Sequence, residues 1–508
     1  METKKRKVLL RITDLKQYFP LRKGLAVKAN DGISIDIYER ETFGLVGESG
    51  CGKSTLGRTI LQLYHQTDGR TMYYGRTLQE VAPKYFLNTV NQLPKRKAEM
   101  LEKQKKADAL QREYDALPEK EQYARHSALM AAKKEAKDAL LDVTNLVGGL
   151  VVLDDLAPVQ ALYREEYKRA LKLRKLSEQL QTSMVHLEYL RWKAQEKPSP
   201  AAHAAVTRGE EAVGAIQQQI DEVQKSLQEN REKINALRKP LEDRPDYQEY
   251  NAHLDQGVDL ARLTYEEMRK LRSDLQLIFQ DPYSSLDPRN SVGQIIGEGM
   301  IAHGYYHRND ERMKAEVTRI MEECGLAPYF MHRYPHQFSG GQRQRIGIAR
   351  ALAVRPKFVV CDEAVSALDV SIQSQVLNLL QELKEKQNLT YLFITHDLSV
   401  VKYISDRIGV MYLGTMVEMA DSEEIFRHPR HPYTEALISA IPTTEEESNR
   451  ELVILEGDIP SPVNSPKGCK FHTRCKYATD ICHQVVPQWR EVGENHFVAC
   501  HHMLGDDL

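Results

Sequence analysis

Nine consecutive residues near the start of the chain carry the groups that can hold a polyphosphate. The stretch GESGCGKST matches the spacing G-x-x-x-x-G-K-[ST]. Its glycines allow the backbone to fold into a nest whose N–H groups point at phosphate oxygens. Lys53 can reach the β- and γ-phosphates, and Ser54 can ligate Mg²⁺. We therefore expect the whole stretch to bind a nucleoside triphosphate: Gly47, Glu48, Ser49, Gly50, Cys51, Gly52, Lys53, Ser54 and Thr55.

The flanks of this loop supply the elements that must position it. TFGLVG reads as an apolar strand that ends at Gly47, and LGRTILQLY continues with helical periodicity. Strand, loop and helix are the context that the pattern requires, and the helix N-terminus adds partial positive charge. Cys51 occupies a variable position of the loop, and we interpret it as a tolerated small residue. A reactive thiol there would make the site sensitive to oxidation.

Two further strands end in polar residues that suit hydrolysis of a phosphoanhydride. Residues 358–361 form a buried-strand pattern, and Asp362 and Glu363 follow at its carboxyl end. An open α/β sheet places its ligands at that edge. Asp362 suits the metal, and Glu363 suits polarisation of the attacking water. A second apolar strand, residues 391–394, precedes His396, which could contact the γ-phosphate.

A second glycine-rich turn precedes another helix. HQFSGGQRQRIGIARAL places Ser339, Gly340, Gly341 and Gln342 directly before an amphipathic pattern, as at an anion site on a helix start. The first loop already holds one triphosphate, so this turn needs another nucleotide. A dimer satisfies that need if each turn caps the nucleotide held by the partner's loop.

Length and composition limit the class of protein. The chain has 508 residues, too many for one ordinary domain. Lys and Arg total 70 against 72 Asp and Glu, so charge gives no argument for a nucleic-acid partner. No apolar run approaches the ~18 residues of a membrane span, and no signal-peptide pattern appears. We expect a soluble, cytoplasmic chain.

Together these motifs resemble those of ABC-transporter ATPases. GESGCGKST resembles Walker A, FVVCDE resembles Walker B, and FSGGQ resembles the signature motif. Gln280 in LIFQDP resembles the Q-loop, Asp369 in SALD the D-loop, and His396 the switch histidine. Phe19 falls where the family places an aromatic ring that stacks on adenine, with Tyr18 as the alternative.

This resemblance implies an α/β fold with a RecA-like parallel sheet, an antiparallel β subdomain and a helical signature subdomain. It also implies ATP hydrolysis with Mg²⁺. Ser54, Gln280 and Asp362 would hold the metal. Catalysis would fall to Glu363, His396, Lys53 and Gln280. Phe19, Asp369 and the two glycine-rich segments would complete the ATP site.

Three further stretches of the sequence are similar to ATPases of oligopeptide and dipeptide importers. The chain resembles the F-type member of the paired ATPases more than the D-type member. CDEAVSALDVSIQSQV, MYLGTMVE and HPRHPYTEAL carry this likeness. The family usually has proline after the Walker B glutamate, where this chain has Ala364, which leaves the glutamate less constrained. The resemblance implies two transmembrane permease subunits, a sister ATPase or a second copy, and an extracellular substrate-binding protein. It places the chain on the cytoplasmic face of the membrane, with no nucleic acid.

Nearly two hundred residues separate the two parts of the ATPase core, which are adjacent in the family. Six apolar residues recur every seven positions and form one row. A second row with the same period consists of three apolar residues and one asparagine. This is a heptad seam, predicted to pair with an antiparallel helix through a turn at EKPSPAAHAA, with a further helical stretch at about 95–141. We expect a coiled-coil arm that is either a tolerated insertion or a docking arm. The rows are Val206, Val213, Ile220, Leu227, Ile234 and Leu241, with Ile216, Val223, Asn230 and Leu237; the partner residues are Leu173, Leu176, Leu180, Leu187 and Leu190.

The insertion also motivates an alternative function. DNA-maintenance ATPases of the SMC kind place coiled coil between the same motifs, but after the Q-loop, whereas here it precedes Gln280. Translation-type ABC proteins carry two cassettes, and one is found here. The predicted parts are therefore residues 7–78 and 262–425 for the ATPase core, 79–261 for the insertion, and 426–508 for a C-terminal extension.

Four of the seven cysteines lie in this extension: Cys469, Cys475, Cys482 and Cys500. In a cytoplasmic chain such a set suggests a metal centre more than disulfides. Four thiolates suit a [4Fe–4S] cluster, which the resemblance also implies. Because histidines lie nearby in the sequence, zinc is an alternative. Free thiols without a metal are the third possibility.

Overall fold

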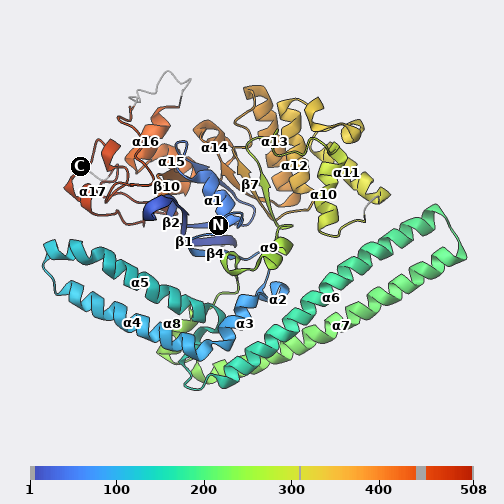
Figure 1. Cartoon of the computed structure of the whole chain (residues 1–508), viewed down its shortest axis with the longest axis horizontal. Helices are drawn as coiled ribbons and strands as arrows, with labels where there is room; N and C mark the ends of the chain where they lie inside the picture. The colour runs from blue at the N-terminus through green and yellow to red at the C-terminus, as the bar shows by residue number, and fades with distance from the viewer. Residues whose placement is uncertain (1–5, 308–309, 442–452, 506–508) are drawn as a thin grey trace. The chain divides into compact units, whose positions relative to one another are not determined.

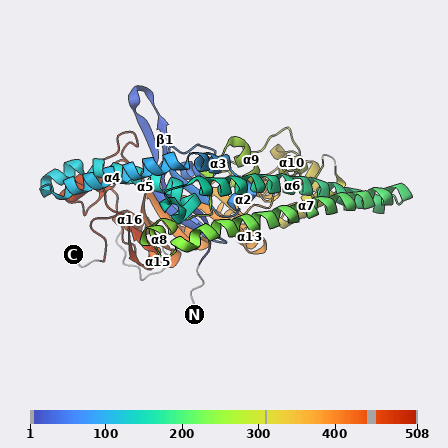
Figure 2. The ribbon, with the colours of Figure 1, turned by 90° about the horizontal axis from the view of Figure 1, so that it is seen from below.

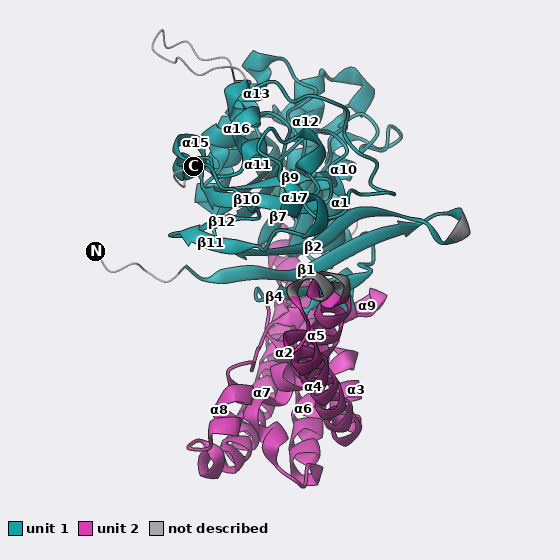
Figure 3. Cartoon of the chain, turned by 90° about the vertical axis from the view of Figure 1, so that its left-hand side faces the viewer, with its two compact units in different colours: residues 1–75, 259–261, 268–508 teal, residues 76–258, 262–267 magenta. Residues whose placement is uncertain are grey.

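The computed structural model of the chain describes residues 6–307, 310–441 and 453–505. It divides into two compact units, which Figure 3 shows in different colours. The first unit comprises residues 1–75, 259–261 and 268–508. The second unit, called the helical unit below, comprises residues 76–258 and 262–267.

The first unit is built on an eight-stranded sheet with the order β11-β12-β10-β9-β3-β8-β7-β6. The five strands from β9 to β6 are parallel, and their residues are almost all buried. Their carboxyl ends therefore share one edge of the sheet, where the predicted site residues follow. The strands are β3 (Thr42–Val46), β6 (Leu275–Ile278), β7 (Phe358–Asp362), β8 (Thr390–Ile394), β9 (Arg407–Tyr412), β10 (Thr415–Asp421), β11 (Arg490–Gly493) and β12 (His496–Val498).

A second sheet of four strands has the order β2-β1-β4-β5. β1 (Val8–Pro20) lies between β2 (Ala26–Tyr38) and β4 (Asp68–Tyr73), antiparallel to both, and β5 is Val258–Asp259. Parallel sheet, antiparallel sheet and helices together confirm the predicted α/β class.

Helices complete the first unit. α1 (Lys53–Ile60) follows β3 through the glycine-rich loop. A separate group packs around Ile296, Met321 and Ile346, which are all buried. This group comprises α10 (Val292–Ala302), α11 (Glu311–Glu323) and α12 (Gly340–Leu352); α13 (Val370–Gln387) and α14 (Leu398–Ile404) follow it in the chain.

The C-terminal extension packs against the edge of the main sheet. β12 pairs with β10, and α15 (Ser422–Arg427) and α16 (Pro432–Ser439) precede it in the chain. Tyr433 and Phe471 are buried in a cluster that also contains Val46 of β3. The extension is therefore continuous with the core that carries the glycine-rich loop. Its remaining element is α17 (Asp480–Gln484).

The helical unit consists mainly of two antiparallel hairpins, which Figures 1 and 2 both show side by side within their pairs: α4 with α5, and α6 with α7. α6 and α7 have 40 and 39 residues. α7 contains the predicted heptad rows as far as Leu237, and α6 contains the predicted partner residues. The bounds are α2 (Leu78–Val81), α3 (Lys84–Asn91), α4 (Leu93–Asp115), α5 (Glu119–Val147), α6 (Ala157–Glu196), α7 (Pro200–Arg238), α8 (Pro245–Asn251) and α9 (Tyr265–Leu271), which crosses the boundary between the units.

Part of the predicted seam packs between α6 and α7. Leu176 of α6 lies in one apolar cluster with Ile220, Val223 and Leu227 of α7. Asn230 is 2% exposed, and its Nδ2 donates to the carbonyl of Leu162 at 3.0 Å. The buried amide thus has a partner on the facing helix.

The predicted helical stretch at about 95–141 is helical, but it consists of two helices. α4 ends at Asp115 and α5 begins at Glu119, so the segment turns back on itself. The cause is Pro118, which cannot continue a helix because its ring displaces the preceding turn. The 3₁₀ turn Gly148–Val152 then lies in the apolar core of the unit, with Leu150 and Val151 buried.

Candidate nucleotide site

The glycine-rich loop has the backbone that its sequence predicts. Gly47, Gly50 and Gly52 have φ angles of 153°, 80° and 101°, which side chains rarely allow. A Cβ atom at Gly47 would lie 2.2 Å from the carbonyl oxygen of Met411, and one at Gly52 would lie 2.1 Å from that of Ala29. The loop can therefore take this shape only with glycine at those two positions.

Lys53 lies inside the loop rather than in solvent. It is 4% exposed, and its Nζ donates to the carbonyl oxygens of Gly47 and Glu48 at 2.7 and 3.1 Å. Below it, the buried side chain of Asn30 donates to the carbonyl of Gly52 at 3.0 Å. The ammonium is thus held at the concave side of the loop, where phosphate oxygens would meet it.

The two oxygen groups predicted to hold magnesium come together. Ser54 Oγ donates to Asp362 Oδ1 at 2.5 Å, and Asp362 is fully buried. Arg58 of α1 donates to the other carboxylate oxygen at 3.2 Å. Sequence reasoning missed Arg58, although its place on the helix after the loop is the signal that could have found it. A hard divalent cation prefers such oxygen ligands.

The predicted general base lies beside two other predicted residues. Gln280 Nε2 donates to Glu363 Oε2 at 2.6 Å, and His396 Nδ1 lies 3.6 Å from Glu363 Oε1. This contact leaves the Gln280 amide oxygen available as a metal ligand. Glu363 has a φ of 47°, a strained value for a residue with a side chain, and its N–H donates to the carbonyl of Ile394. Its neighbour Ala364 is buried.

The two candidates for the adenine contact differ in how they are held. The Tyr18 hydroxyl donates to Asp31, and burial raises the pKa of Tyr18. Phe19 instead meets the ring of Tyr64 edge-on, with centroids 5.4 Å apart. Phe19 is the ring with no polar tether, so it remains our candidate.

The second glycine-rich turn is a helix cap with an open outer face. Ser339 is the N-cap of α12, where its Oγ accepts from Gln342 N and the Gln342 side chain accepts from Ser339 N. Ser339 and Gly340 are exposed, whereas Gly341 is buried. A Cβ atom at Gly341 would lie 2.4 Å from Ile372 Cγ2, so this position has no room for a side chain. Asp369 caps α13 in the same way by accepting from Ile372 N at 3.0 Å.

Two contacts from the C-terminal extension hold the loop, and sequence reasoning missed both. Arg474 donates to both carboxylate oxygens of Glu48, at 2.8 and 3.2 Å. The hydroxyl of Tyr433, which is fully buried, accepts from Glu48 N at 2.9 Å. Residues more than 380 positions away thus fix one loop residue by its side chain and its backbone. No local signal could have indicated this pairing.

Cys51 is not arranged as an oxidation-sensitive thiol. It is 5% exposed, and burial raises its pKa, which disfavours the reactive thiolate. The structure supports its interpretation as a tolerated small residue.

The four cysteines of the extension line one small pocket of about 10 Å³. None of them forms a disulfide. Burial raises the pKa of Cys469 to about 11 and that of Cys500 to about 12. Within residues 6–307, 310–441 and 453–505, no three His, Cys, Asp or Glu side chains have the arrangement of a metal site. The donor set fits a four-thiolate centre, but the described geometry does not show one.

Four histidines also line this pocket, and one ring nitrogen of each has a partner in the protein, as is common for histidines that bind a metal through the other nitrogen. His472 Nδ1 lies 2.7 Å from the carbonyl of Cys469, His501 Nε2 lies 2.9 Å from that of Val485, and His502 Nε2 lies 2.7 Å from Thr479 Oγ1. His431 is a buried helix cap whose pKa burial lowers to about 4. Ring nitrogens of all four already have partners in the protein.

Comparison with known protein families shows which family has these motifs. The ABC transporter family model matches residues 30–161 and 237–366, which together exceed half of the chain. The chain belongs to the ABC transporter family. It is an ABC ATPase, and a second model, for the C-terminal region of oligopeptide/dipeptide transporters, matches residues 417–482.

Individual relatives of this ABC ATPase agree with that assignment. The oligopeptide transport ATP-binding protein AppF of Bacillus subtilis is 52% identical over 251 residues, which cover 49% of this chain and 76% of AppF. OppF of Haemophilus influenzae is 48% identical over 246 residues, covering 48% and 74%. YkfD of Bacillus subtilis is 35% identical over 495 residues, covering 97% of this chain and 95% of YkfD. The match to YkfD therefore extends into the helical unit.

Within the ranges that the structure describes, no helix is both long and apolar enough to cross a lipid bilayer.

Proposed function

We propose that this ABC ATPase binds and hydrolyses ATP to power the import of oligopeptides or dipeptides through membrane permease subunits. The observation that carries the proposal is the cluster Gln280–Glu363–His396 beside the Ser54–Asp362 pair, behind a loop with the backbone of a phosphate nest. The names of AppF and OppF and the oligopeptide/dipeptide model support peptides as the cargo.

The proposed mechanism uses each residue in the position described. Lys53 and the loop N–H groups bind the phosphates, and Glu363 accepts a proton from the water that attacks the γ-phosphorus. Gln280 holds one oxygen of that carboxylate, which orients the other. Mg²⁺, held by Ser54, Asp362 and Gln280, would neutralise charge on the phosphate oxygens. Ser339 of a second copy or a sister ATPase would cap the same nucleotide.

The site residues are tested by replacing Glu363 with glutamine. Glu363→Gln keeps the side-chain volume and a partner for Gln280 but cannot accept the proton. We expect ATP binding to be unchanged and hydrolysis to be nearly abolished. Glu382→Gln, an exposed residue on α13 of the same unit, is the matched control and should keep full activity. Hydrolysis by Glu363→Gln at the parental rate would show that the base is another residue.

Peptide import needs a separate test because the cargo is read by other subunits. The partners would be two permeases, a sister ATPase or second copy, and an extracellular binding protein, on the cytoplasmic face of the membrane. Co-purification of the tagged chain from membranes, followed by mass spectrometry, should return permeases encoded with a peptide-binding protein. Recovery of partners from DNA maintenance or translation would favour the alternative function instead.

We also propose that Cys469, Cys475, Cys482 and Cys500 hold a [4Fe–4S] cluster. The support is that all four line one pocket. Protein purified without oxygen should be brown, with four irons per chain, and the replacement Cys475→Ser should lose the colour. Colourless protein that contains one zinc would overturn the assignment.

The helical unit contains residues 79–258 of the proposed coiled-coil insertion, residues 79–261. Its support is the seam of α6 and α7 and the compactness of residues 76–258. The ATPase core would then be residues 7–78 and 262–425, followed by the extension 426–508. We propose that the insertion serves as a docking element for another subunit.

A further inference from the structure

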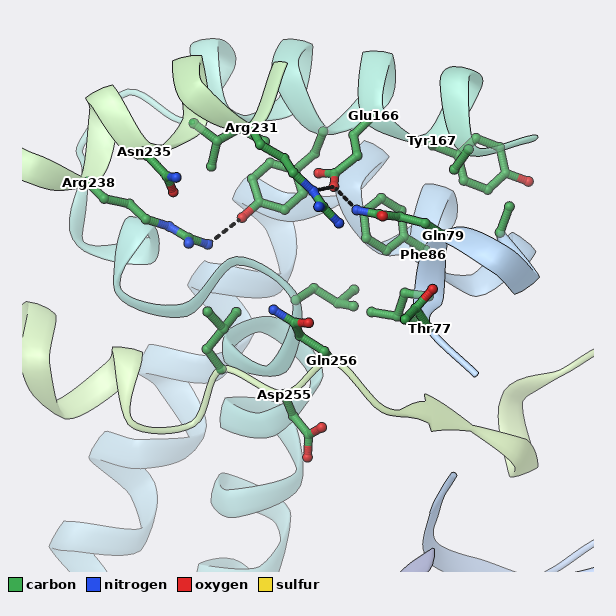
Figure 4. A pocket seen from close by; sticks show the side chains of 17 residues that line it. Thr77, Gln79, Phe86, Glu166, Tyr167, Arg231, Asn235, Arg238, Asp255 and Gln256 are labelled. Atoms are coloured by element: carbon green, nitrogen blue, oxygen red, sulfur yellow. Dashed lines mark hydrogen bonds and ion pairs between the residues drawn. The ribbon is translucent and has the colours of Figure 1, made fainter. Parts of the chain in front are cut away.

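The helical unit contains a cavity of about 370 Å³ that the ATPase mechanism does not use. Figure 4 shows it between α2, α3, α6 and α7. All of its lining residues belong to the helical unit, so its shape is set within one compact body. Its volume is at the lower end of the ~300–1,000 Å³ found for small-molecule sites, which favours a small ligand.

Among the described residues, no acidic side chain forms an ion pair with Arg238, which lies on one wall of the cavity. Arg238 Nη2 donates to the hydroxyl of Tyr163 at 3.1 Å, a neutral acceptor. Its Nε is buried and meets no acceptor within the described residues. A guanidinium has five N–H donors, and leaving them unsatisfied away from water is costly. Arg238 therefore has unused capacity to bind an anion.

The other charged residues of the lining already have hydrogen-bond or ion-pair partners. Glu166 accepts from Gln79 at 2.8 Å and lies 3.9 Å from Arg231. Asp255 accepts from Gly257 N at 2.8 Å, and in Figure 4 its carboxylate points away from the three arginine and glutamate side chains. The lining therefore holds two carboxylates and two guanidiniums, and Arg238 is the guanidinium that does not pair with Glu166.

The rest of the lining is apolar enough to hold a hydrocarbon body. Phe86, Tyr167 and Ile234 line the cavity and are each less than 10% exposed. The rings of Phe86 and Tyr167 are stacked, with centroids 6.2 Å apart, which fixes that wall. Asn235 and Gln256 add amide groups that can orient a polar head.

We propose that this cavity binds a small organic carboxylate, with its head on Arg238 and its apolar body against Phe86, Tyr167 and Ile234. A planar carboxylate matches the fork of a guanidinium better than a point charge would. The site is independent of the nucleotide loop, so the proposal goes beyond the import function and does not depend on it.

The test uses three probes that share a phenyl ring: a carboxylate and its amide with the same two-carbon spacer, and a phosphate joined to the ring through oxygen alone. 3-Phenylpropionate, 3-phenylpropanamide and phenyl phosphate are titrated into the full chain by calorimetry and by ligand-observed NMR. We expect the carboxylate to bind most tightly. Arg238→Gln should weaken that binding by about tenfold or more, because a charge-assisted contact is lost. Arg191→Gln, which removes an exposed arginine of α6 paired with Glu210, is the matched control and should bind like the parent.

A second variant protects the test against loss of folding. Asn235→Phe places a ring into the cavity from an exposed helix position, so it should block binding while leaving thermal unfolding and ATP hydrolysis unchanged. Equal binding of the amide and the carboxylate would overturn the proposal. So would parental binding by Arg238→Gln or Asn235→Phe. Tighter binding of phenyl phosphate would replace the carboxylate with a phosphate ligand.

Discussion

The loop half of the nucleotide site, built from residues 47–55 and Asp362, is closed by contacts within the chain, whereas the signature half, residues 339–342, has an exposed outer face. Lys53 and Asp362 are 4% and 0% exposed, and each is held by hydrogen bonds. Ser339 is exposed, and the hydrogen bonds of its hydroxyl group and its backbone N–H cap its own helix.

This difference indicates how the site is divided. Buried charged groups must be paired, so the loop half has to be assembled by the fold before any ligand arrives. A helix cap in solvent has no such requirement, and its N-terminal dipole can be completed by an anion from another molecule. One chain therefore builds the phosphate cradle, and a second molecule is needed to use the signature turn.

The largest effect should come from removing the charge in the loop half. Lys53→Met keeps most of the apolar stem but removes the ammonium, and we expect kcat for ATP to fall by about 10²–10³-fold, as when one preorganised donor is lost. Steady-state hydrolysis measures this fall. Lys386→Met, in an exposed ion pair on α13, is the control and should leave kcat unchanged. A loss smaller than about threefold would contradict the role of Lys53 in the mechanism.

The signature half should behave differently when it is broken. Ser339→Arg places a bulky cation on the exposed face, and we expect hydrolysis to fall by about 10²-fold because the second molecule cannot close on the nucleotide. Binding of a fluorescent ATP analogue to the isolated chain should change by less than about twofold, since the loop half is intact. If ATP affinity fell as much as hydrolysis did, the division between the two halves would be wrong.

Removing the contact between the C-terminal extension and the glycine-rich loop should have an intermediate effect. Arg474→Gln removes a bidentate pair with Glu48, and we expect the Kd for ATP to rise by about tenfold, in line with the strength of charge-assisted hydrogen bonds. Equilibrium titration with a fluorescent ATP analogue measures the Kd. Arg427→Gln, which loses only an exposed pair with Glu423, should leave it unchanged. Equal affinities in both variants would show that Arg474 does not position the loop.

The placement of the proposed ATP-site residues could be predicted because each follows a strand or precedes a helix with a local signal. Glycines in the loop, carboxylates after β7 and the serine before α12 all act through backbone positions within a few residues. The structure brings Gln280, Glu363 and His396 together from three loops that follow neighbouring parallel strands. Parallel pairing is what makes this convergence predictable.

The contacts of Arg474 and Tyr433 could not be predicted in the same way. They join Glu48 to residues that are more than 380 positions later, and no period or spacing in the sequence encodes such a pair. The break between α4 and α5 was predictable in principle from Pro118. The helical composition of the flanking residues hid it, because lysine, glutamate and alanine favour helix on both sides.

The smallest effect should come from the helical unit, at the buried amide of its seam. Asn230 donates to Leu162 on the facing helix, so it is satisfied only in one register. Asn230→Leu should stabilise the unit by about 1 kcal/mol, because a buried amide is replaced by an apolar group, while allowing slippage of α7 along α6. Thermal unfolding measures the first effect, and cysteine crosslinking between facing positions measures the second. Gln217→Leu, an exposed change on α7, should alter neither. A loss of stability with an unchanged register would show that the amide contributes more to packing than to the choice of register.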